Sequence, residues 1–188
     1  MSRIGFAMCG SFCTHTAALH VLKELLTRGY AIQPILSECA YTTDTRFGTS
    51  AALRKALESL CGQDIIHTVE QAEPLGPAQP LDALVICPCT GNTLSKLANG
   101  VTDGPVTMAA KAHLRTDRPL LITLASNDAM SANLCNIGIL LPRKSVFFTP
   151  LKQDDPEKKP HSLVADFSLV PEALDAAVNG RQVRPLFR

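Results

Sequence analysis

Short, uncharged polar residues follow a buried apolar run in the middle of the chain. The run Leu84–Cys87 ends at Pro88, and a helical pattern begins shortly after it. Such a strand–turn–helix unit delivers hydroxyl, amide and backbone N–H groups to the carboxyl edge of a sheet, where open α/β sheets bind ligands. The residues that supply these groups are Thr90, Gly91, Asn92 and Thr93. Because glycine has no side chain, a flat ligand is able to approach the backbone closely, and we predict a binding edge here.

The first strand-to-helix turn carries residues suited to a phosphate. Gly10 permits a tight turn, and Ser11 and Thr14 place hydroxyls beside the free N–H groups of a helix start, which attract anions. The turn has neither the GxGxxG nor the P-loop pattern, so it does not predict a dinucleotide or ATP site. Helix capping is the alternative role for the two hydroxyls. Ser37 ends the next strand at the same edge and favours phosphate binding.

A third cluster of polar residues follows the apolar run Leu120–Leu124. Ser126 or Asn127 caps the helix that comes next, or Asn127 meets the polar edge of a ligand ring. Met130 belongs either to the core or to the apolar face of the same ring. The cluster repeats the arrangement after Leu84–Cys87, so we include Ser126, Asn127 and Met130 in the predicted cofactor site.

Few residues are candidates for catalysis. His67 lies in a strand-like run, where a packed histidine is the simpler explanation and a catalytic group the alternative. Arg46, beside Phe47 in the loop after the second strand, is the best charged candidate, although it could instead order the turn or belong to a solvated or subunit-interface loop. Lys158 and Lys159 come next, but a solvated or subunit-interface loop explains them better. No Cys/His spacing predicts a metal site.

Apolar runs alternate with amphipathic ones along the chain. The strand-like runs are Ile4–Cys9, Ala31–Leu36, Ile65–Val69, Leu84–Cys87, Leu120–Leu124 and Val146–Leu151. The helical patterns are Thr14–Arg28, Ser50–Leu60, Thr93–Asn99, Val106–Leu114, Ala129–Ile137 and Pro171–Asn179. This alternation predicts an α/β fold: a doubly wound parallel sheet of about six strands, with helices on both faces. We expect one domain over residues 1–188, with a C-terminal loop and helix (152–188) packed on it.

Composition narrows the possible partners. The 188 residues include 18 Lys plus Arg against 17 Asp plus Glu and no Trp, so we expect no nucleic-acid partner. No apolar run approaches membrane-spanning length and no signal-peptide pattern begins the chain, so we expect no membrane and a cytoplasmic location. The seven scattered cysteines fit reduced thiols in that compartment. Cys89 is either a reactive thiolate at a helix start or a packed thiol, and packing is the simpler explanation.

With such residues at the ends of four strands, the chain resembles the flavin-binding cysteine decarboxylase family, which includes phosphopantothenoylcysteine decarboxylases and flavin prenyltransferases. The family's Gly-Ser turn matches Gly10-Ser11, its proline, small-residue, Asn and Thr signature matches Pro88–Thr93, and its downstream Asp matches Asp103. The resemblance implies a Rossmann-like flavoprotein fold that binds FMN at this edge. It also implies homo-oligomers, trimers or larger, with the flavin near an interface.

Two features depart from the decarboxylases of that family. His67 lies further before the Pro88 motif than their catalytic histidine does, and their PxMNxxMW-like motif is reduced to residues Ala125–Met130. Both differences argue against decarboxylation.

Four further motifs resemble one group within the family: Asp44–Gly48, Ala72–Pro77, Ser126–Ala129 and Gln153–Pro160. This group comprises flavoprotein-like subunits of two-component synthases from spore-forming bacteria. The resemblance implies oxidation of a small dicarboxylate in the mother-cell cytosol during sporulation, with NAD(P) carried by the partner component.

Three functional hypotheses stay open from the sequence. The first is an oxidoreductase subunit that acts with its partner component. The second is a non-catalytic oligomeric subunit that binds flavin or regulates. The third is an FMN-dependent decarboxylase or prenyltransferase acting through His67.

Overall fold

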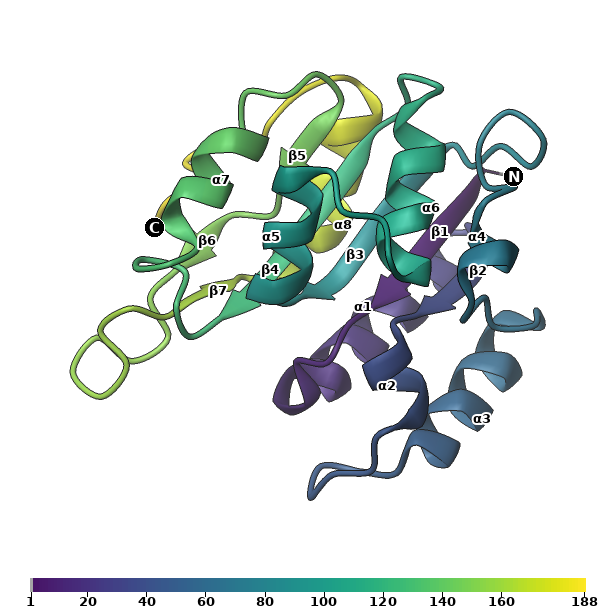
Figure 1. Cartoon of the computed structure of the whole chain (residues 1–188), viewed down its shortest axis with the longest axis horizontal. Helices are drawn as coiled ribbons and strands as arrows, with labels where there is room; N and C mark the ends of the chain where they lie inside the picture. The colour runs from purple at the N-terminus through teal and green to yellow at the C-terminus, as the bar shows by residue number, and fades with distance from the viewer. Residues whose placement is uncertain (1) are drawn as a thin grey trace.

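Seven strands form one sheet in the computed structural model, which describes residues 2–188 (Figure 1). The strands are β1 (Arg3–Met8), β2 (Ala31–Leu36), β3 (Ala83–Cys89), β4 (Leu120–Ser126), β5 (Val146–Phe148), β6 (Leu151–Lys152) and β7 (Leu163–Ala165). The α-helices are α1 (His15–Thr27), α2 (Glu38–Thr42), α3 (Ser50–Cys61), α4 (Val69–Ala72), α5 (Gly91–Asn99), α6 (Pro105–Leu114), α7 (Leu134–Leu140) and α8 (Val170–Val178). Two 3-10 helices, η1 (Phe12–Thr14) and η2 (Phe167–Leu169), precede α1 and α8.

The sheet is mixed. Its parallel part has the order β2-β1-β3-β4-β5, and β7 and β6 add an antiparallel pair beside β4. The predicted doubly wound fold is therefore confirmed. The sheet has seven strands where about six were expected, and the pair β6 and β7 is antiparallel. The order places the topological switch between β1 and β3, and ligands of open α/β sheets bind at the carboxyl edge beside such a switch.

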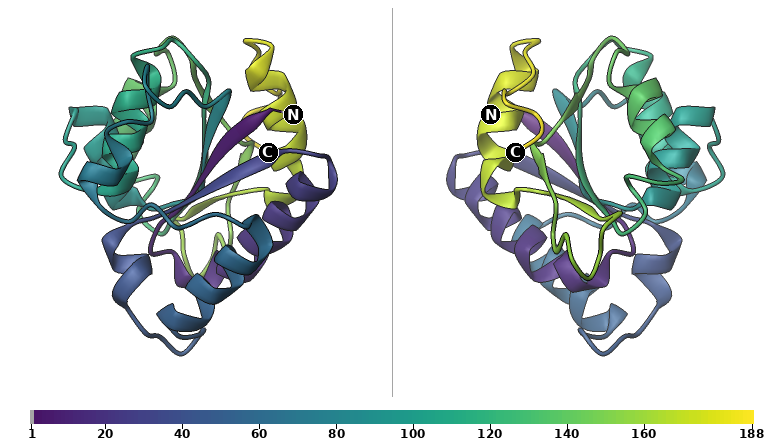
Figure 2. Two further views of the ribbon diagram at one scale, coloured as in Figure 1. Left: turned by 90° about the vertical axis from the view of Figure 1, so that its right-hand side faces the viewer. Right: turned by 90° about the vertical axis from the view of Figure 1, so that its left-hand side faces the viewer.

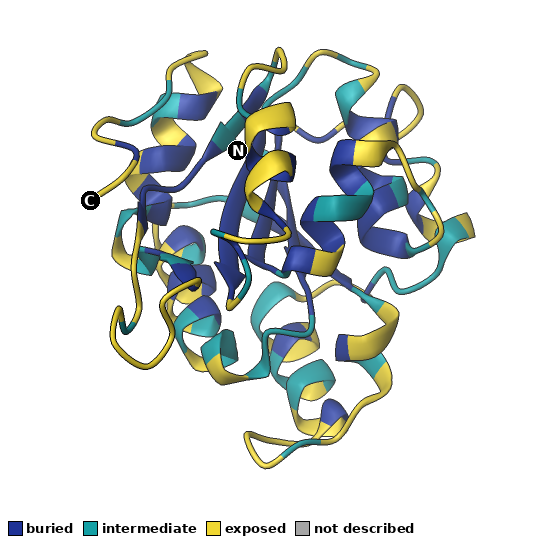
Figure 3. Ribbon diagram, turned by 60° about the vertical axis from the view of Figure 1, so that its left-hand side comes forward, coloured by how far each residue is buried: buried dark blue, intermediate teal, exposed yellow. Residues whose placement is uncertain are grey.

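Helices cover both faces of the sheet. In Figure 2, α1 and α8 lie on one side and α5, α6 and α7 on the other. Buried side chains of α1, α3 and α8 pack on one sheet face, and those of α5, α6 and α7 pack on the opposite face. Because both faces are covered, the central strands consist mainly of apolar residues. They are almost fully buried, as the dark blue strands of Figure 3 show.

Two predicted strands are different in the structure. The run Ile65–Val69 contributes only one bridge, from Ile66 to Ile35 of β2, because Thr68 and Gln71 then form a capping box that starts α4. The run Val146–Leu151 is divided between β5 and β6. Its interruption contains Pro150, which has no N–H to donate to a ladder.

The helix predicted to begin at Ala129 begins instead at Leu134. The backbone carbonyl of Asp128 accepts hydrogen bonds from the N–H groups of Ser131 and Asn133, at 3.1 and 3.2 Å. These bonds hold the segment before α7 in turns. The Asp128 side chain stabilises the same turns, because its Oδ2 accepts a hydrogen bond from Asn133 Nδ2 at 2.9 Å.

Candidate functional site

Two clefts open at the carboxyl edge of the sheet and meet at Gly10, Thr90 and Asn92. The wide cleft, about 890 Å³, lies between the turn after β1, the turn after β3, the end of β4 and the β6–β7 loop. Its lining includes the predicted residues Gly10, Ser11, Thr14, Thr90, Gly91, Asn92, Ser126 and Asn127. The narrow cleft, about 390 Å³, is lined in part by Ser37 and Thr93. The structure thus brings together predicted residues from the ends of four strands.

A chain of buried hydrogen bonds ties β1 to the turn after β3. The Thr90 hydroxyl donates to Thr93 Oγ1 (3.1 Å), and the Thr93 hydroxyl donates to Cys9 Sγ (3.2 Å). Thr90 Oγ1 also accepts from the Thr93 N–H and so caps α5. These two hydroxyls are therefore occupied in holding the edge together, and Asn92, which is exposed and lines both clefts, is the freer polar side chain.

Gly91 is required by packing. A Cβ added there would lie 2.6 Å from both Asn133 Nδ2 and Ser126 Oγ, and 2.8 Å from Asp128 Oδ1. Ser126 Oγ donates to Asp128 Oδ1, and Asn133 Nδ2 donates to Asp128 Oδ2 at 2.9 Å. Asn136 Nδ2 in turn donates to Asn133 Oδ1 at 2.9 Å. This polar network fixes one wall of the wide cleft against the start of α5.

The turn after β1 presents one unoccupied hydroxyl. Ser11 precedes η1 and its side chain makes no capping bond, whereas the Thr14 hydroxyl donates to the Ser11 carbonyl at 2.8 Å. His15 Nε2 donates to the Cys9 carbonyl at 2.8 Å. Partial burial lowers the pKa of His15, so its ring is neutral near pH 7. Ser11 is thus the hydroxyl in this turn that is positioned for an anion.

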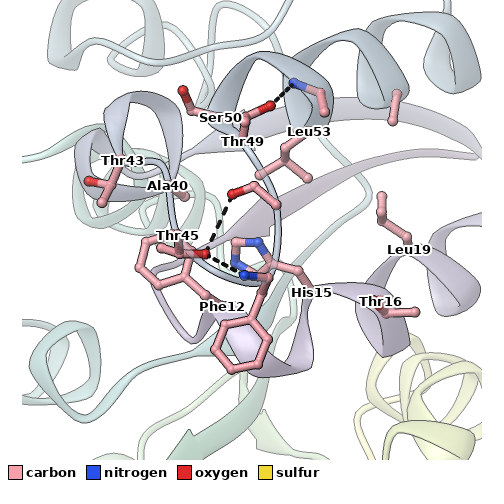
Figure 4. Close-up of a pocket in the computed structure, with 14 residues that line it drawn as sticks. Phe12, His15, Thr16, Leu19, Ala40, Thr43, Thr45, Thr49, Ser50 and Leu53 are labelled. Atoms are coloured by element: carbon pink, nitrogen blue, oxygen red, sulfur yellow. Dashed lines mark hydrogen bonds between the residues drawn. The ribbon is translucent and has the colours of Figure 1, made fainter.

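A small side pocket of about 180 Å³ adjoins the wide cleft, and Phe12 and Phe47 line both (Figure 4). Its wall is formed by α1, α2, α3 and the loop 43–49, with His15 among the lining side chains. At the start of α3, Asp44 Oδ1 accepts from the N–H and the hydroxyl of Ser50, at 2.8 and 3.0 Å. Because a carboxylate already occupies this helix end, the pocket is unsuited to an anion.

Ser37, at the narrow cleft, caps a helix. Its Oγ accepts from the Ala40 N–H at 3.2 Å and caps the short helix α2. On the opposite side of the same cleft, Lys96 Nζ and Asp103 Oδ2 form an ion pair of 2.9 Å. Phosphate binding by Ser37 stays a prediction.

The remaining predicted residues lie away from the lining of the two clefts. Met130 packs beside the core, and its backbone N–H donates to the His161 carbonyl at 2.9 Å. His67 is half-buried and stacks on Tyr41. Arg46 is exposed, with its guanidinium carbon 4.8 Å from the centroid of the Phe47 ring, and Phe47 itself lines the wide cleft.

Sequence reasoning missed some residues of this site. Asp128 and Asn133 were not expected to build its wall, and a buried Asp–Asn network after a strand has no distinctive spacing. Asp154 and Lys159 line the wide cleft, although they belong to a loop expected to be solvated. Their position at the cleft becomes visible only in the structure, where the β6–β7 loop folds back toward the end of β4.

The buried thiols near the site are packed groups. Burial raises the pKa of Cys9 to about 11, and it also raises the pKa values of Cys87 and Cys89. Cys89 Sγ, where a helix-start thiolate was the alternative, is therefore protonated near neutral pH. Within residues 2–188, no group of three or more His, Cys, Asp or Glu side chains is placed to hold a metal. In the same part of the chain, no helix has the length and apolar character needed to cross a bilayer.

A doubly wound sheet with ligand-sized clefts at its switch point defines a ligand-binding α/β protein. The Flavoprotein family model matches residues 1–155. The B subunit of dipicolinate synthase from Bacillus subtilis (strain 168) is 44% identical over 184 residues, which cover 98% of this chain and 92% of that protein. The chain therefore belongs to the flavoprotein family, and within it to the family of dipicolinate synthase B subunits.

Solved structures agree with this assignment. The crystal structure of the dipicolinate synthase B subunit from Bacillus halodurans C superposes with a TM-score of 0.91 at 39% identity, covering 100% of this chain and 96% of that one. The FMN-dependent cysteine decarboxylase SpaF has a TM-score of 0.68 at 24% identity, with coverage of 94% and 97%. The second likeness concerns the fold alone.

Proposed function

We propose that the chain is the B component of a dipicolinate synthase and acts with the A component to convert dihydrodipicolinate to dipicolinate during sporulation. The observation that carries the proposal is the pair of clefts meeting at Gly10, Thr90 and Asn92, in a chain 44% identical to such a B component. The reaction is an oxidation, so the protein is an oxidoreductase subunit. Its place is the mother-cell cytosol.

FMN is the cofactor that we propose for the wide cleft. The cleft falls within the size range of cofactor sites, and it combines a close-approach glycine with small polar groups. The unoccupied Ser11 hydroxyl and the exposed Asn92 amide are suited to a phosphate and to the polar edge of a ring, and Asn127 lies across the cleft from them. FMN bound here would supply a two-electron acceptor. NAD(P), carried by the A component, is the acceptor that we propose for regeneration.

Aromatisation of dihydrodipicolinate removes a hydride equivalent and a proton from a dianion. A substrate with two carboxylates requires cationic partners at the cleft. Arg46 is proposed as one of them, because it extends over the ring of Phe47 at the wall of the wide cleft. His67 stacks on Tyr41 outside both clefts, which favours the oxidoreductase over a decarboxylase acting through His67.

We also propose a homo-oligomer, which the resemblance to the flavin-binding family implies. The outer surface of helix α7 is consistent with such an assembly. It carries two exposed apolar side chains, Leu134 (50% exposed) and Ile139 (43% exposed), which a neighbouring subunit would cover. Sedimentation of the purified protein measures the assembly.

Purified protein tests the cofactor directly. A yellow preparation that releases FMN on denaturation, or that takes up FMN on incubation, is the expected result. An Asn92→Asp variant should bind FMN at least about tenfold more weakly, because a carboxylate has no N–H to donate and repels the carbonyl oxygens at the polar edge of the ring. A colourless wild type that does not bind added FMN would remove the flavin and leave a protein that supports its partner. Dipicolinate formation with and without the A component then locates the oxidation.

A further inference from the structure

The β6–β7 loop carries charge into the wide cleft. Within residues 2–188, the charged side chains that line this cleft are Asp128, Asp154 and Lys159, so Lys159 is its one cation. Asp128 is already held by Ser126 and Asn133. In Figure 1 the loop projects from the same edge of the molecule as the 43–49 loop. Among its lining residues, the cleft therefore offers an anionic ligand a single ammonium group, and Arg46 over the Phe47 ring is a further cation beside the lining.

The backbone around Lys159 is anchored over the cleft. The Lys159 N–H donates to the Asp155 carbonyl (2.7 Å), and the Lys159 carbonyl accepts from the Ser162 N–H (3.0 Å). The bond from the Met130 N–H to the His161 carbonyl joins the loop to the turn after β4. These contacts hold the backbone of the loop beside the cleft, and Lys159 is one of the residues that line it.

Lys159 is paired with a side chain that it can release. Its Nζ forms an ion pair with Asp154, and the two side chains are 54% and 40% exposed. Exposed ion pairs of this kind contribute little to stability, so exchanging the Asp154 carboxylate for another costs little. The neighbouring Lys158 is exposed but does not line the cleft.

We propose that Lys159 binds one carboxylate of the dicarboxylate substrate, and that Asp154 holds the ammonium group while the cleft is free of substrate. Substrate then takes the place of Asp154 as the partner of Nζ. Arg46, beside Phe47 at the wall of the same cleft, is left for the second carboxylate. The identity of the dicarboxylate rests on the proposed function, whereas the roles of Lys159 and Asp154 rest on the geometry of the loop.

Asp154 also influences how tightly the cleft binds the dicarboxylate. With Asp128 and Asp154 both on the lining, the cleft opposes a dianion unless the ammonium group faces it. Removing the charge of Asp154 should therefore free Lys159 and strengthen dicarboxylate binding. Removing Lys159 should leave two carboxylates facing the substrate.

Calorimetric titration of the full-length, FMN-treated protein with dipicolinate tests the proposal. Lys159→Ala should weaken binding by roughly tenfold or more, Lys159→Arg should retain most of it, and Asp154→Asn should strengthen it. Lys158→Ala is the matched control, with unchanged affinity expected. In the complex with the A component, Lys159→Ala should raise the KM for dihydrodipicolinate more than it lowers kcat. A melting temperature within the range of the wild type establishes that each variant is folded.

Results other than these would each contradict one part of the proposal. Wild-type affinity for dipicolinate in Lys159→Ala, or equal weakening in Lys158→Ala, would overturn the role of Lys159 while the proposed function stands. A wild type that binds dipicolinate but forms none from dihydrodipicolinate with the A component would overturn the proposed function and leave the dicarboxylate site. A wild type that binds no dipicolinate at millimolar concentration would overturn the site itself.

Discussion

The imidazole of His67 lies flat on the phenol ring of Tyr41, with the ring centroids 4.0 Å apart and the planes 4° apart. The His67 N–H donates to Gln71 Oε1 at 2.9 Å, and its Nδ1 lies 3.1 Å from the Ile65 carbonyl. Tyr41 belongs to α2, and the guanidinium of Arg54 in α3 covers its ring. His67 is thus part of a packing arrangement at the β2 side of the sheet.

This arrangement predicts that His67→Ala retains most of the turnover of the two-component complex. The variant should lose about 1 kcal/mol of stability, because the stacked pair is lost. Steady-state kinetics and urea unfolding measure the two quantities. A loss of kcat of about a hundredfold with intact folding would instead make His67 a catalytic group.

Gly91→Ala should destabilise the protein by about 1–3 kcal/mol and weaken FMN binding. The added methyl group has to displace Ser126 and Asn133, which form the wall of the wide cleft. Gly138→Ala is the matched control, since Gly138 is also helical and has no atom within 4 Å of the added Cβ. It should stabilise the protein by up to about 1 kcal/mol. Equal effects of the two substitutions in urea unfolding would contradict the packing role of Gly91.

The sequence predicted the parallel core of the fold and the position of the site edge, because both depend on local patterns. An apolar run that ends in small polar residues is visible at Leu84–Thr93, and β3 with α5 follows it closely. The antiparallel pair β6 and β7 escaped prediction. These strands are two and three residues long, and their pairing partners are set by the return of the chain to β4.

The difference between local sequence patterns and tertiary contacts also explains which site residues were not predicted. Thr90 and Asn92 belong to the Pro88–Thr93 signature, which is visible in the sequence. The role of Asp128, by contrast, depends on its hydrogen bonds with Ser126 and Asn133 and on the close approach of Gly91. Lys159 resembles any loop lysine until the loop is placed over the cleft. The sequence pattern shows which residues directly follow a strand. Which residues from distant parts of the chain contact them depends on tertiary packing.

Thiol reactivity should divide six of the seven cysteines into two groups. Cys9, Cys87 and Cys89 are buried with raised pKa values, so they should resist a thiol reagent at pH 8 until the protein unfolds. The exposed thiols should react quickly in the native protein: Cys13, Cys39 and Cys135. Mass spectrometry after brief labelling identifies the sites. Rapid native labelling of Cys89 would show that this thiol is accessible at the start of α5.

His113 makes stability depend on pH. Its ring is 1% exposed, Nε2 donates to the Pro119 carbonyl at 3.0 Å, and Nδ1 is buried with no hydrogen-bond partner among residues 2–188. Burial lowers the pKa of His113 in the folded protein. The hydrogen bond to the Pro119 carbonyl opposes this effect, and of the nearby charges Arg118 adds to it and Asp82 opposes it. The folded state therefore resists protonation that the unfolded state accepts.

As the pH falls below the unfolded value of about 6.5, the unfolded chain binds a proton at His113 that the folded chain does not, so the free energy of unfolding decreases. Above that pH the residue has no such effect. The decrease attributable to His113 is at most about 1.4 kcal/mol per pH unit. His15, whose pKa is also lowered, adds to it in the wild type. His113→Gln keeps a donor for the Pro119 carbonyl without a titrating group, so its stability should fall less between pH 7.5 and pH 5.5. Urea unfolding at the two pH values measures the difference, and identical pH dependence in the two proteins would exclude His113 as its source.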